Sequence, residues 1–395
     1  MMRSATPLSI VMIGQKGLPA RSGGIERHVG LLASGLAKLG HTVTVYARAW
    51  YTSGGPLESR IHQVFTPGIR TKHLDAITHS FTALIHARTI HPDVIHLHGS
   101  GIALLTPVAR LFHPRARIVV TLHCVDSVLT KWGAIARSAF QLGERFACLF
   151  AHEVITVSQV LASYYAETYG RQTSFITHPF SATNPVYSAD PIVAAGFRPG
   201  SYLLMVARLI PDKQAHVLVD AYAEARTRLP HAFASMPLVI IGDTSWTDDY
   251  ARMLRAKVRN TPHVYLLGER VGDEVRAFQT HAFAHVFPSG SEGMPFSLLE
   301  AGASGRICIA TNLPQHREAL GTGFLPVESG SVESLTQALC IAVSMSQEDR
   351  DQLTRTAHAR IEKQFSPEDR IRDVDALYQS SVTAQVPAAY SPHVL

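Results

Sequence analysis

The chain has 395 residues, 46% hydrophobic and 17% charged, a composition that excludes a disordered protein and suffices for two domain cores. The net charge of +5 arises from 36 Lys and Arg against 31 Asp and Glu. This excess is too small for a nucleic-acid-binding protein but suits an anionic substrate or an anionic membrane surface. The 4 cysteines show no Cys-x-x-Cys spacing and predict free thiols in a reducing compartment.

The start of the chain lacks the apolar segment of a signal peptide. No apolar run approaches the ~20 residues that a transmembrane helix needs. We therefore expect a cytoplasmic protein, and peripheral contact with the inner membrane face is left open.

In the first half, short runs rich in Val and Ile alternate with helical periodicity and predict strands at 8–13, 42–46, 93–97, 117–122 and 153–157. A Gly-rich loop after the first run leads into a helix from Ile25 to Leu39, which Gly40 is expected to end. Continuous apolar strands of this kind belong in a parallel sheet with helices on both faces.

A proline-rich segment from His178 to Gly200 interrupts this pattern and predicts a connection between two domains. A second series of apolar runs predicts strands at 202–207, 238–241, 264–267, 285–287 and 307–310. Helices are expected at 331–343 and 347–364, and Ser366 with Pro367 is expected to open a last helix. The expected domains are residues 1–180 with the returning helix 366–380, then 181–365, and a mobile tail of 381–395.

Both series thus predict an α/β fold of two Rossmann-like, doubly wound domains. Ligands of open α/β sheets bind beyond the carboxyl ends of the strands. With two such sheets, the expected binding site is a central cleft that both domains face. The distinctive residues of this sequence do follow predicted strands.

Gly23 and Gly24 belong to a loop between the first strand and its helix. Glycine lets backbone N–H groups approach a phosphate closely, and a helix N-terminus favours negative charge. The loop has neither the dinucleotide-binding nor the P-loop spacing, which weakens the hypothesis of a nicotinamide-dependent dehydrogenase. An ordinary Gly-rich turn is the alternative.

Arg208 and Lys213 follow the first strand of the second series. Two cations at one strand-to-helix turn have the chemistry to bind a diphosphate. The alternative is a solvated turn whose charges form only surface pairs.

The segment from Phe287 to Ala301 combines a strand end, a Gly/Ser loop with Glu292, and a helix with Glu300. Pro295 suits the first turn of that helix. The N–H groups from Met294 to Ser297 are candidates for phosphate binding, and a carboxylate held by packing can accept hydrogen bonds from sugar hydroxyls. A solvent-facing Glu300 is the alternative.

His123 and Asp126 follow the strand at 117–122. His123 is a candidate for hydrogen bonding to a sugar hydroxyl or to the reacting centre, and a structural histidine is the alternative. Asp126 either orients an acceptor hydroxyl or caps the next turn. His96 and His98 would share one strand face as a metal pair, but no third ligand is near in sequence, so a strand end beside a pocket is the preferred interpretation.

From about Ser9 to about Tyr378, the chain resembles retaining glycosyltransferases of the GT-B fold, close to family 4. The strongest match is Glu292-x7-Glu300, which has the form of their EX7E motif. Other matching segments are the Gly-rich loop to Glu26, 121–126, 206–213 and 311–318. The segments 17–26 and 131–133 are similar to members described as rhamnosyltransferases of polysaccharide synthesis.

The resemblance implies roles for individual residues. Arg208 and Lys213 would neutralise the donor diphosphate and the charge that develops on the leaving group. Glu292 would contact the donor sugar, Glu300 the ribose hydroxyls, and His123 the sugar from the N-terminal domain; Arg208, Lys213, Glu292 and His123 form the expected catalytic set. Further expected donor-binding residues are Gly23, Gly24, Gly268, Gly293, Met294, Pro295, Phe296 and Ser297.

Three segments depart from the family's usual pattern: Cys124 follows His123, residues 177–180 read Thr-His-Pro-Phe, and Glu269-Arg270 follows Gly268. They leave the nucleotide base and the acceptor pocket open. Candidate acceptor-side residues are Asp126, Lys131 and Trp132. For a lipid-linked acceptor, Lys131, Trp132 and Arg137 are the candidates for contact with a membrane surface, and an ordinary amphipathic helix is the alternative.

The expected reaction moves a hexosyl or deoxyhexosyl group from a nucleoside diphosphate sugar to a saccharide or lipid-linked saccharide in surface polysaccharide or glycolipid synthesis. The anomeric configuration would be retained. No Asp-x-Asp metal site is recognisable, so no metal or other cofactor is expected, and no nucleic acid partner. The alternatives are a nucleotide-sugar epimerase, which needs no acceptor, and a non-catalytic sugar-nucleotide-binding component of a polysaccharide assembly complex.

Overall fold

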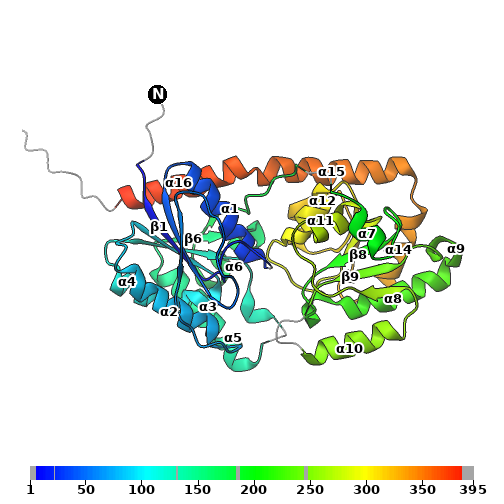
Figure 1. The fold of residues 1–395 in the computed structure, drawn as a ribbon, viewed down its shortest axis with the longest axis horizontal. Helices are drawn as coiled ribbons and strands as arrows, with labels where there is room; N and C mark the ends of the chain where they lie inside the picture. Colours follow the sequence, from blue (N-terminus) through cyan, green and yellow to red (C-terminus); the bar gives the residue numbers. More distant parts are fainter. Residues whose placement is uncertain (1–5, 22, 130–131, 184–186, 244–247, 385–395) are drawn as a thin grey trace, which may run out of the picture. The chain divides into compact units, whose positions relative to one another are not determined.

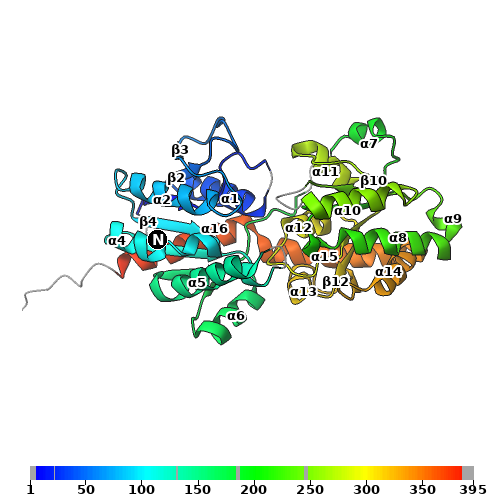
Figure 2. The same cartoon turned by 90° about the horizontal axis from the view of Figure 1, so that it is seen from below.

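The structure, a computed structural model, describes residues 6–21, 23–129, 132–183, 187–243 and 248–384. The chain forms two compact units (Figures 1 and 2). The first, here the N-terminal domain, comprises Met1–Ser127, Ala134–Pro179 and Pro367–Leu395. The second, the C-terminal domain, comprises Val128–Gly133 and Phe180–Ser366.

The N-terminal domain contains a seven-stranded sheet in the order β3-β2-β1-β4-β5-β6-β7, in which every neighbouring pair is parallel. Its strands are β1 (Ser9–Ile13), β2 (Thr42–Ala47), β3 (Ile61–Phe65), β4 (Val94–His98), β5 (Arg117–Leu122), β6 (Glu153–Thr156) and β7 (Ser174–Phe175). Its helices are α1 (Gly24–Lys38), α2 (Asp75–Ala87), α3 (Ser100–Ala103), α4 (Thr106–Phe112), α5 (Ala134–Phe150), α6 (Gln159–Tyr169) and α16 (Pro367–Thr383), and a 3-10 turn, η1 (Asp126–Val128), follows β5.

Alternate strand residues face opposite sides of this sheet, so each face has its own core. Ile10 and Met12 of β1 pack on the face covered by α1 and α16, whereas Val11 and Ile13 pack on the face covered by α2 to α5. Figure 1 shows these two helical layers. The expectation of a parallel sheet buried on both faces is confirmed for this domain.

The last helix, α16, belongs to the N-terminal domain, as the returning helix was expected to do. It packs on α1 at Gly35, where a Cβ atom would lie 2.1 Å from Cδ1 of Ile371. Only glycine permits this close approach of the two helices. Helix α16 continues to Thr383, so the expected tail at 381–395 is wrong in its first three residues, which are helical because Ser381 is buried and accepts a hydrogen bond from Arg117. The rest of that tail, from 385 on, lies outside the described residues.

The C-terminal domain contains a six-stranded parallel sheet in the order β10-β9-β8-β11-β12-β13. Its strands are β8 (Leu203–Val206), β9 (Leu238–Ile241), β10 (Val264–Leu266), β11 (Ala284–Phe287), β12 (Ile307–Thr311) and β13 (Leu325–Val327). Its helices are η2 (Pro211–Lys213, a 3-10 turn), α7 (Asp190–Ala194), α8 (Ala215–Arg228), α9 (Pro230–Phe233), α10 (Asp248–Arg259), α11 (Gly272–Thr280), α12 (Phe296–Ala303), α13 (Pro314–Leu320), α14 (Val332–Ser344) and α15 (Gln347–Phe365).

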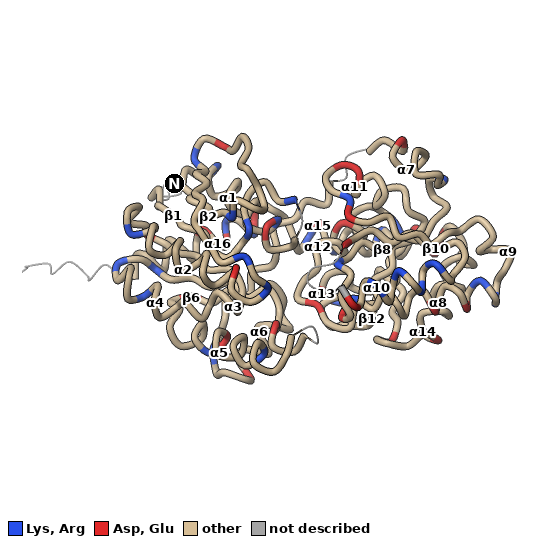
Figure 3. Tube along the Cα trace, turned by 60° about the horizontal axis from the view of Figure 1, so that its bottom comes forward, with Lys and Arg blue, Asp and Glu red and all other residues tan. Residues whose placement is uncertain are grey.

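This second sheet also has a core on each face. Leu203 and Met205 of β8 pack towards α8 and α14, and Leu204 packs towards α7 and α11. Helices α8 and α10 lie side by side in both views (Figures 1 and 2). Basic and acidic positions are interspersed along both domains (Figure 3). Each helix in the described part of the chain is too short or too polar to span a bilayer.

Candidate functional site

The best-formed part of the candidate site in the C-terminal domain lies at the carboxyl ends of β8 and β11, which are neighbours in the sheet. Lys213 ends the turn after β8, and Glu292 lies in the loop after β11. The Gly290 N–H donates to the Asp212 carbonyl at 2.8 Å and ties the loop to the turn. Two segments 79 residues apart in sequence therefore meet at one point.

At this point the ammonium of Lys213 donates to the carboxylate of Glu292. The two side chains are only 16% and 9% exposed, so the ion pair is poorly screened by water. Burial alone would raise the pKa of Glu292, but Lys213, His316 and hydrogen bonds from Lys213 and Ser289 hold it below its usual value. The carboxylate is therefore ionised at neutral pH and fixes the position of the ammonium.

His316 is a buried neighbour of this pair to which the sequence analysis gave no role. Its Nδ1 lies 2.8 Å from the carbonyl oxygen of Thr311, so Nδ1 carries the proton and donates. Burial lowers the pKa of His316, although the charge of Glu292 opposes this shift. Its buried Nε2 atom has no hydrogen-bond partner among the described residues. The protonated form of this ring would stabilise the ionised form of Glu292.

Arg208 lies two residues after the end of β8, just beyond the strand as expected, and is exposed. Its carbonyl accepts from the Ile210 N–H at 2.9 Å, which shapes the turn, and Leu209 donates to the Asp243 carbonyl at 3.0 Å. Among the described residues the guanidinium forms no ion pair. Arg208 is therefore a charged group available to an anionic ligand, whereas Lys213 already has a carboxylate partner.

Glu300 lies in α12, one helix after Glu292, and accepts a hydrogen bond from Nε2 of Gln279 at 2.7 Å. It is half-buried, so the fully solvent-facing alternative does not apply. The two carboxylates of the motif thus have different partners, Lys213 for Glu292 and Gln279 for Glu300.

The residues at the start of α12 occupy slightly different positions from those expected. Pro295 is the N-cap, with φ −77° and ψ 124°, and the helix begins at Phe296. The placement of Pro295 within the first turn is therefore wrong, because its backbone is extended. Gly293, Met294 and Phe296 are buried, and Ser297 is half-buried in the first turn. On the neighbouring strand ends, the Gly268 carbonyl accepts from the Gly242 N–H at 2.9 Å.

In the N-terminal domain, Gly23 is the N-cap of α1 and Gly24 its first residue, and both are exposed. The buried carboxylate of Glu26 accepts from the Lys16 N–H at 3.1 Å and holds the loop closed. The start of α1 is therefore an ordered and accessible turn.

His123 follows β5, as expected, but it is buried in a cluster of histidines. His28 of α1 and His98 of β4 complete a group whose ring centroids are 5.0 to 5.6 Å apart. A fourth ring, that of His178, stacks on His123 with centroids 5.8 Å apart. Burial and the neighbouring histidines hold the pKa of His123 well below its usual range, so its ring is neutral.

His96 lies on the same strand face as His98, as its spacing predicted, but both of its ring nitrogens have partners. Nδ1 is 2.5 Å from the hydroxyl of Tyr378, and Nε2 is 2.6 Å from that of Thr121. Its role is therefore to join β4 to α16 and β5.

The acceptor-side candidates do not form one group. Asp126 accepts from the Ser100 hydroxyl at 2.6 Å, which ties the turn after β5 to the start of α3. Trp132 lies in the segment grouped with the C-terminal domain. Its backbone N–H donates to the carbonyl of Leu129 at 3.3 Å. Lys131 lies outside the described residues.

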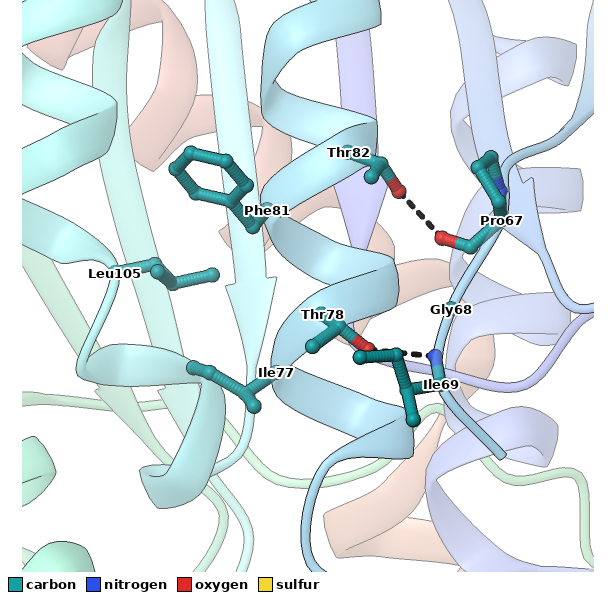
Figure 4. A pocket seen from close by; sticks show the side chains of 8 residues that line it. All are labelled: Pro67, Gly68, Ile69, Ile77, Thr78, Phe81, Thr82 and Leu105. Carbon is teal, nitrogen blue, oxygen red and sulfur yellow. Dashed lines mark hydrogen bonds between the residues drawn. The ribbon is translucent and has the colours of Figure 1, made fainter. Parts of the chain in front are cut away.

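A cavity of about 480 Å³ opens beside α2 in the N-terminal domain (Figure 4). Its hydroxyls are already engaged, since Thr82 donates to the Pro67 carbonyl at 2.6 Å and Thr78 accepts from the Ile69 N–H at 2.9 Å. Its apolar lining lacks the cations that a diphosphate requires. It is lined by Pro67, Gly68, Ile69, Ile77, Thr78, Phe81, Thr82 and Leu105.

Several known proteins are similar to this chain. A glycogen synthase of Mycobacterium tuberculosis is 28% identical over 412 residues, covering 96% of this chain and 94% of that protein. Sucrose-phosphate synthase from Thermosynechococcus elongatus has a similar structure, with a TM-score of 0.79, 17% identity and coverage of 96% and 100%. Anabaena HepE in complex with UDP and glucose has a TM-score of 0.75, 17% identity and coverage of 94% and 100%.

Two family models match the chain, one on each side of the connection between the domains. Residues 22–178 match the model "Glycosyltransferase Family 4", and residues 200–345 match "Glycosyl transferases group 1". The two matches contain the histidine cluster and the Lys213–Glu292 pair, respectively. The chain therefore belongs to glycosyltransferase family 4 and is a glycosyltransferase of the GT-B fold.

Proposed function

We propose that the protein transfers a hexosyl or deoxyhexosyl group from a nucleoside diphosphate sugar to a hydroxyl acceptor, with retention of the anomeric configuration. The observation that carries the proposal is the half-buried Lys213–Glu292 pair at adjacent strand ends, with exposed Arg208 on the same turn. Two cations close to one strand end provide the charge that a diphosphate leaving group requires.

In the proposed reaction, the bond between the anomeric carbon and the diphosphate oxygen breaks, and its electron pair stays on the diphosphate. The acceptor oxygen bonds to the anomeric carbon on the same face, and the hydroxyl proton passes to a diphosphate oxygen. Lys213 and Arg208 stabilise the charge that develops there. The ammonium has three N–H donors, so Lys213 can bind a phosphate oxygen while it stays bonded to Glu292.

We assign the two glutamates of the EX7E motif to the sugar and to the ribose of the donor. Glu292 would accept hydrogen bonds from the sugar hydroxyls and Glu300 from the ribose. The donor site would also use the backbone N–H groups at the start of α12. We propose that the protein's own cations replace the divalent ion that often bridges a nucleotide diphosphate, so that added Mg²⁺ or Mn²⁺ is not required.

The names of the relatives support a sugar nucleotide as donor. One relative is a GDP-mannose-dependent mannosyltransferase of Mycolicibacterium smegmatis acting on a phosphatidylinositol monomannoside, 25% identical over 355 residues. HepE has also been crystallised with UDP-glucose. We propose a role in surface polysaccharide or glycolipid synthesis, in which the acceptor is a saccharide or a lipid-linked saccharide.

Helix α5 supports a lipid-linked acceptor. Ile135, Leu142 and Leu149, seven residues apart and therefore on one side of the helix, are 89%, 44% and 63% exposed. Arg145 is exposed next to this side of the helix, whereas Arg137 is exposed about 140° round the helix from it. An apolar stripe beside basic side chains is typical of helices that bind anionic membrane surfaces. Co-sedimentation with vesicles containing anionic lipid should therefore decrease when Ile135 and Leu149 are both replaced by glutamate, and equal binding by this variant would contradict the assignment.

The experiment that tests the donor assignment is a thermal-shift screen with UDP, GDP, dTDP, CDP and ADP. A nucleotide at 100 times its dissociation constant should stabilise the protein by about 2.7 kcal/mol. We expect one of the five nucleotides to give this shift. The proposal would be contradicted if none of them stabilised the protein. Incubation of the matching sugar nucleotide without an acceptor separates a transferase from an epimerase, because only an epimerase would yield an isomeric sugar nucleotide.

A further inference from the structure

We infer that His28, His98 and His123 form a binding site for a divalent transition metal ion, of which Zn²⁺ is the best match, within the N-terminal domain. One nitrogen of each ring lies within 4.8 Å of those of the other two, and all three side chains are buried. No carboxylate or thiol takes part in the group. Imidazole-only sites select Zn²⁺, Cu²⁺, Ni²⁺ or Fe²⁺ over Mg²⁺ and Ca²⁺.

The topology explains why these rings converge. Strands β1, β4 and β5 are adjacent in the sheet, and the three histidines come from the start of α1, the last residue of β4 and the residue after β5. In β4 and β5, His98 and His123 continue the face on which Val94 and Val119 pack against α1. Gly14 lets β1 approach, since a Cβ atom there would lie 2.4 Å from the His98 carbonyl oxygen.

Two of the rings present a nitrogen without a partner. The Nε2 atoms of His28 and His98 are buried and form no hydrogen bond with the described residues. Such atoms are rare in folded proteins because they have lost water without gaining a replacement. A metal ion bound to both nitrogens would remove this deficit.

The other nitrogen of His28 has the partner that a metal ligand needs. Its Nδ1 lies 2.9 Å from Nδ1 of His178, so a hydrogen bond between them fixes the ring and leaves Nε2 for the ion. Metal-binding histidines commonly use their second nitrogen in this way. His178 is therefore a positioning residue, held outside the ligand set.

The distances suit a zinc site. Zn–N bonds of about 2.0–2.1 Å in a tetrahedron place ligand nitrogens ~3.4 Å apart, and the three candidate nitrogens lie within 4.8 Å of one another. Small shifts of the side chains would therefore bring them to the spacing of a zinc site. Three protein ligands leave a fourth position for water or a hydroxyl.

This inference departs from the expectation that the chain binds no metal. It also changes the role of His123, whose ring would hold the ion. It does not involve the cations of the C-terminal domain, so loss of metal binding and loss of nucleotide binding can be distinguished by separate titrations.

The test is a titration of the full chain, freed of metal with a chelator, with Zn²⁺ by calorimetry and with Co²⁺ by its visible absorption. We expect one equivalent to bind, with the strong absorption of a four-coordinate Co²⁺ site. His28→Gln, His98→Gln and His123→Gln should each weaken binding at least 100-fold, and His178→Ala by about 10–100-fold.

His113→Gln is the matched control, because His113 is buried in the same domain and its Nε2 contacts the Leu84 carbonyl at 2.9 Å, outside the cluster. It should bind metal like the wild type. The proposal is overturned if the wild type binds no stoichiometric ion, or if the three ligand variants bind as tightly as the control. Because the first result needs only wild-type protein, misfolding of a variant leaves the test intact.

Discussion

Replacing Lys213 with alanine removes the more buried of the two proposed donor-site cations. Two unit charges ~4 Å apart interact by roughly 4 kcal/mol at an effective dielectric constant of ~20. The side chain of Lys213 is only 16% exposed, so solvent screens this interaction weakly. The loss of one group that stabilises a transition state typically costs ~2.7–4 kcal/mol, which predicts a decrease in kcat/KM of about 10²–10³-fold for Lys213→Ala.

The same substitution leaves Glu292 without its partner, 9% exposed and close to where the diphosphate would bind. The unpaired carboxylate would repel the diphosphate. The loss of affinity in Lys213→Ala therefore combines a lost attraction with a new repulsion. Nucleoside diphosphate has no sugar for Glu292 to contact, so its affinity isolates the effect of charge. We expect Lys213→Ala to weaken nucleotide binding by ~10²-fold, and the double variant with Glu292→Gln to bind more tightly than Lys213→Ala.

The assay has two parts: calorimetry with the nucleotide found in the thermal-shift screen, and release of that nucleotide from its sugar donor under kcat/KM conditions. Lys257→Ala is the matched control, because Lys257 lies in the same domain and pairs at 2.6 Å with Asp220 on the surface. This control should stay within about twofold of the wild type. If Lys213→Ala also remained within about twofold in both measurements, the assignment of Lys213 to the diphosphate would be refuted.

Three further predictions concern the same molecule. Because Lys213 holds the pKa of Glu292 below its usual value, the stabilisation from this pair is present above the unfolded-state pKa and is lost as pH falls through the lower folded-state pKa. Thermal melts should therefore show Glu292→Gln less stable than wild type by roughly 3–10 °C at neutral pH, with a difference that decreases as the pH is lowered, and a difference that did not change with pH would contradict this account. Gly35→Val should lower the melting temperature of the N-terminal domain by roughly 2–12 °C through its clash with Ile371, and an unchanged melt would show that α16 does not pack there. Arg208→Ala should reduce kcat/KM by about 10²–10³-fold without added Mg²⁺ or Mn²⁺, whereas wild-type dependence on either ion would defeat the proposal that protein cations suffice.

The central strands of both sheets were predictable because they are continuous apolar runs buried on both faces. The sequence analysis missed β3, β7 and β13, which lie at sheet edges. Strand β3 reads Ile-His-Gln-Val-Phe, and β13 contains Pro326, which an edge strand tolerates. Edge strands need fewer apolar residues, so hydrophobic periodicity detects them poorly.

The Lys213–Glu292 contact was approachable from sequence because both residues follow strands, and carboxyl ends of parallel strands meet at one sheet edge. The histidine cluster was not. Its rings come from positions 28, 98, 123 and 178, and only the strand order places them together. The one signal was the His96–His98 pair. The sequence could not show that both ring nitrogens of His96 have hydrogen-bond partners, whereas Nε2 of His98 has none among the described residues.

The central claim is that positive side chains after β8 bind the donor diphosphate, and a crystal structure with the nucleoside diphosphate tests it most directly. We expect diphosphate oxygens about 2.7–2.9 Å from Nζ of Lys213 and from the guanidinium of Arg208, with the carboxylate of Glu292 still bonded to Lys213. A diphosphate bound elsewhere, with both cations facing only solvent or protein, would contradict the account.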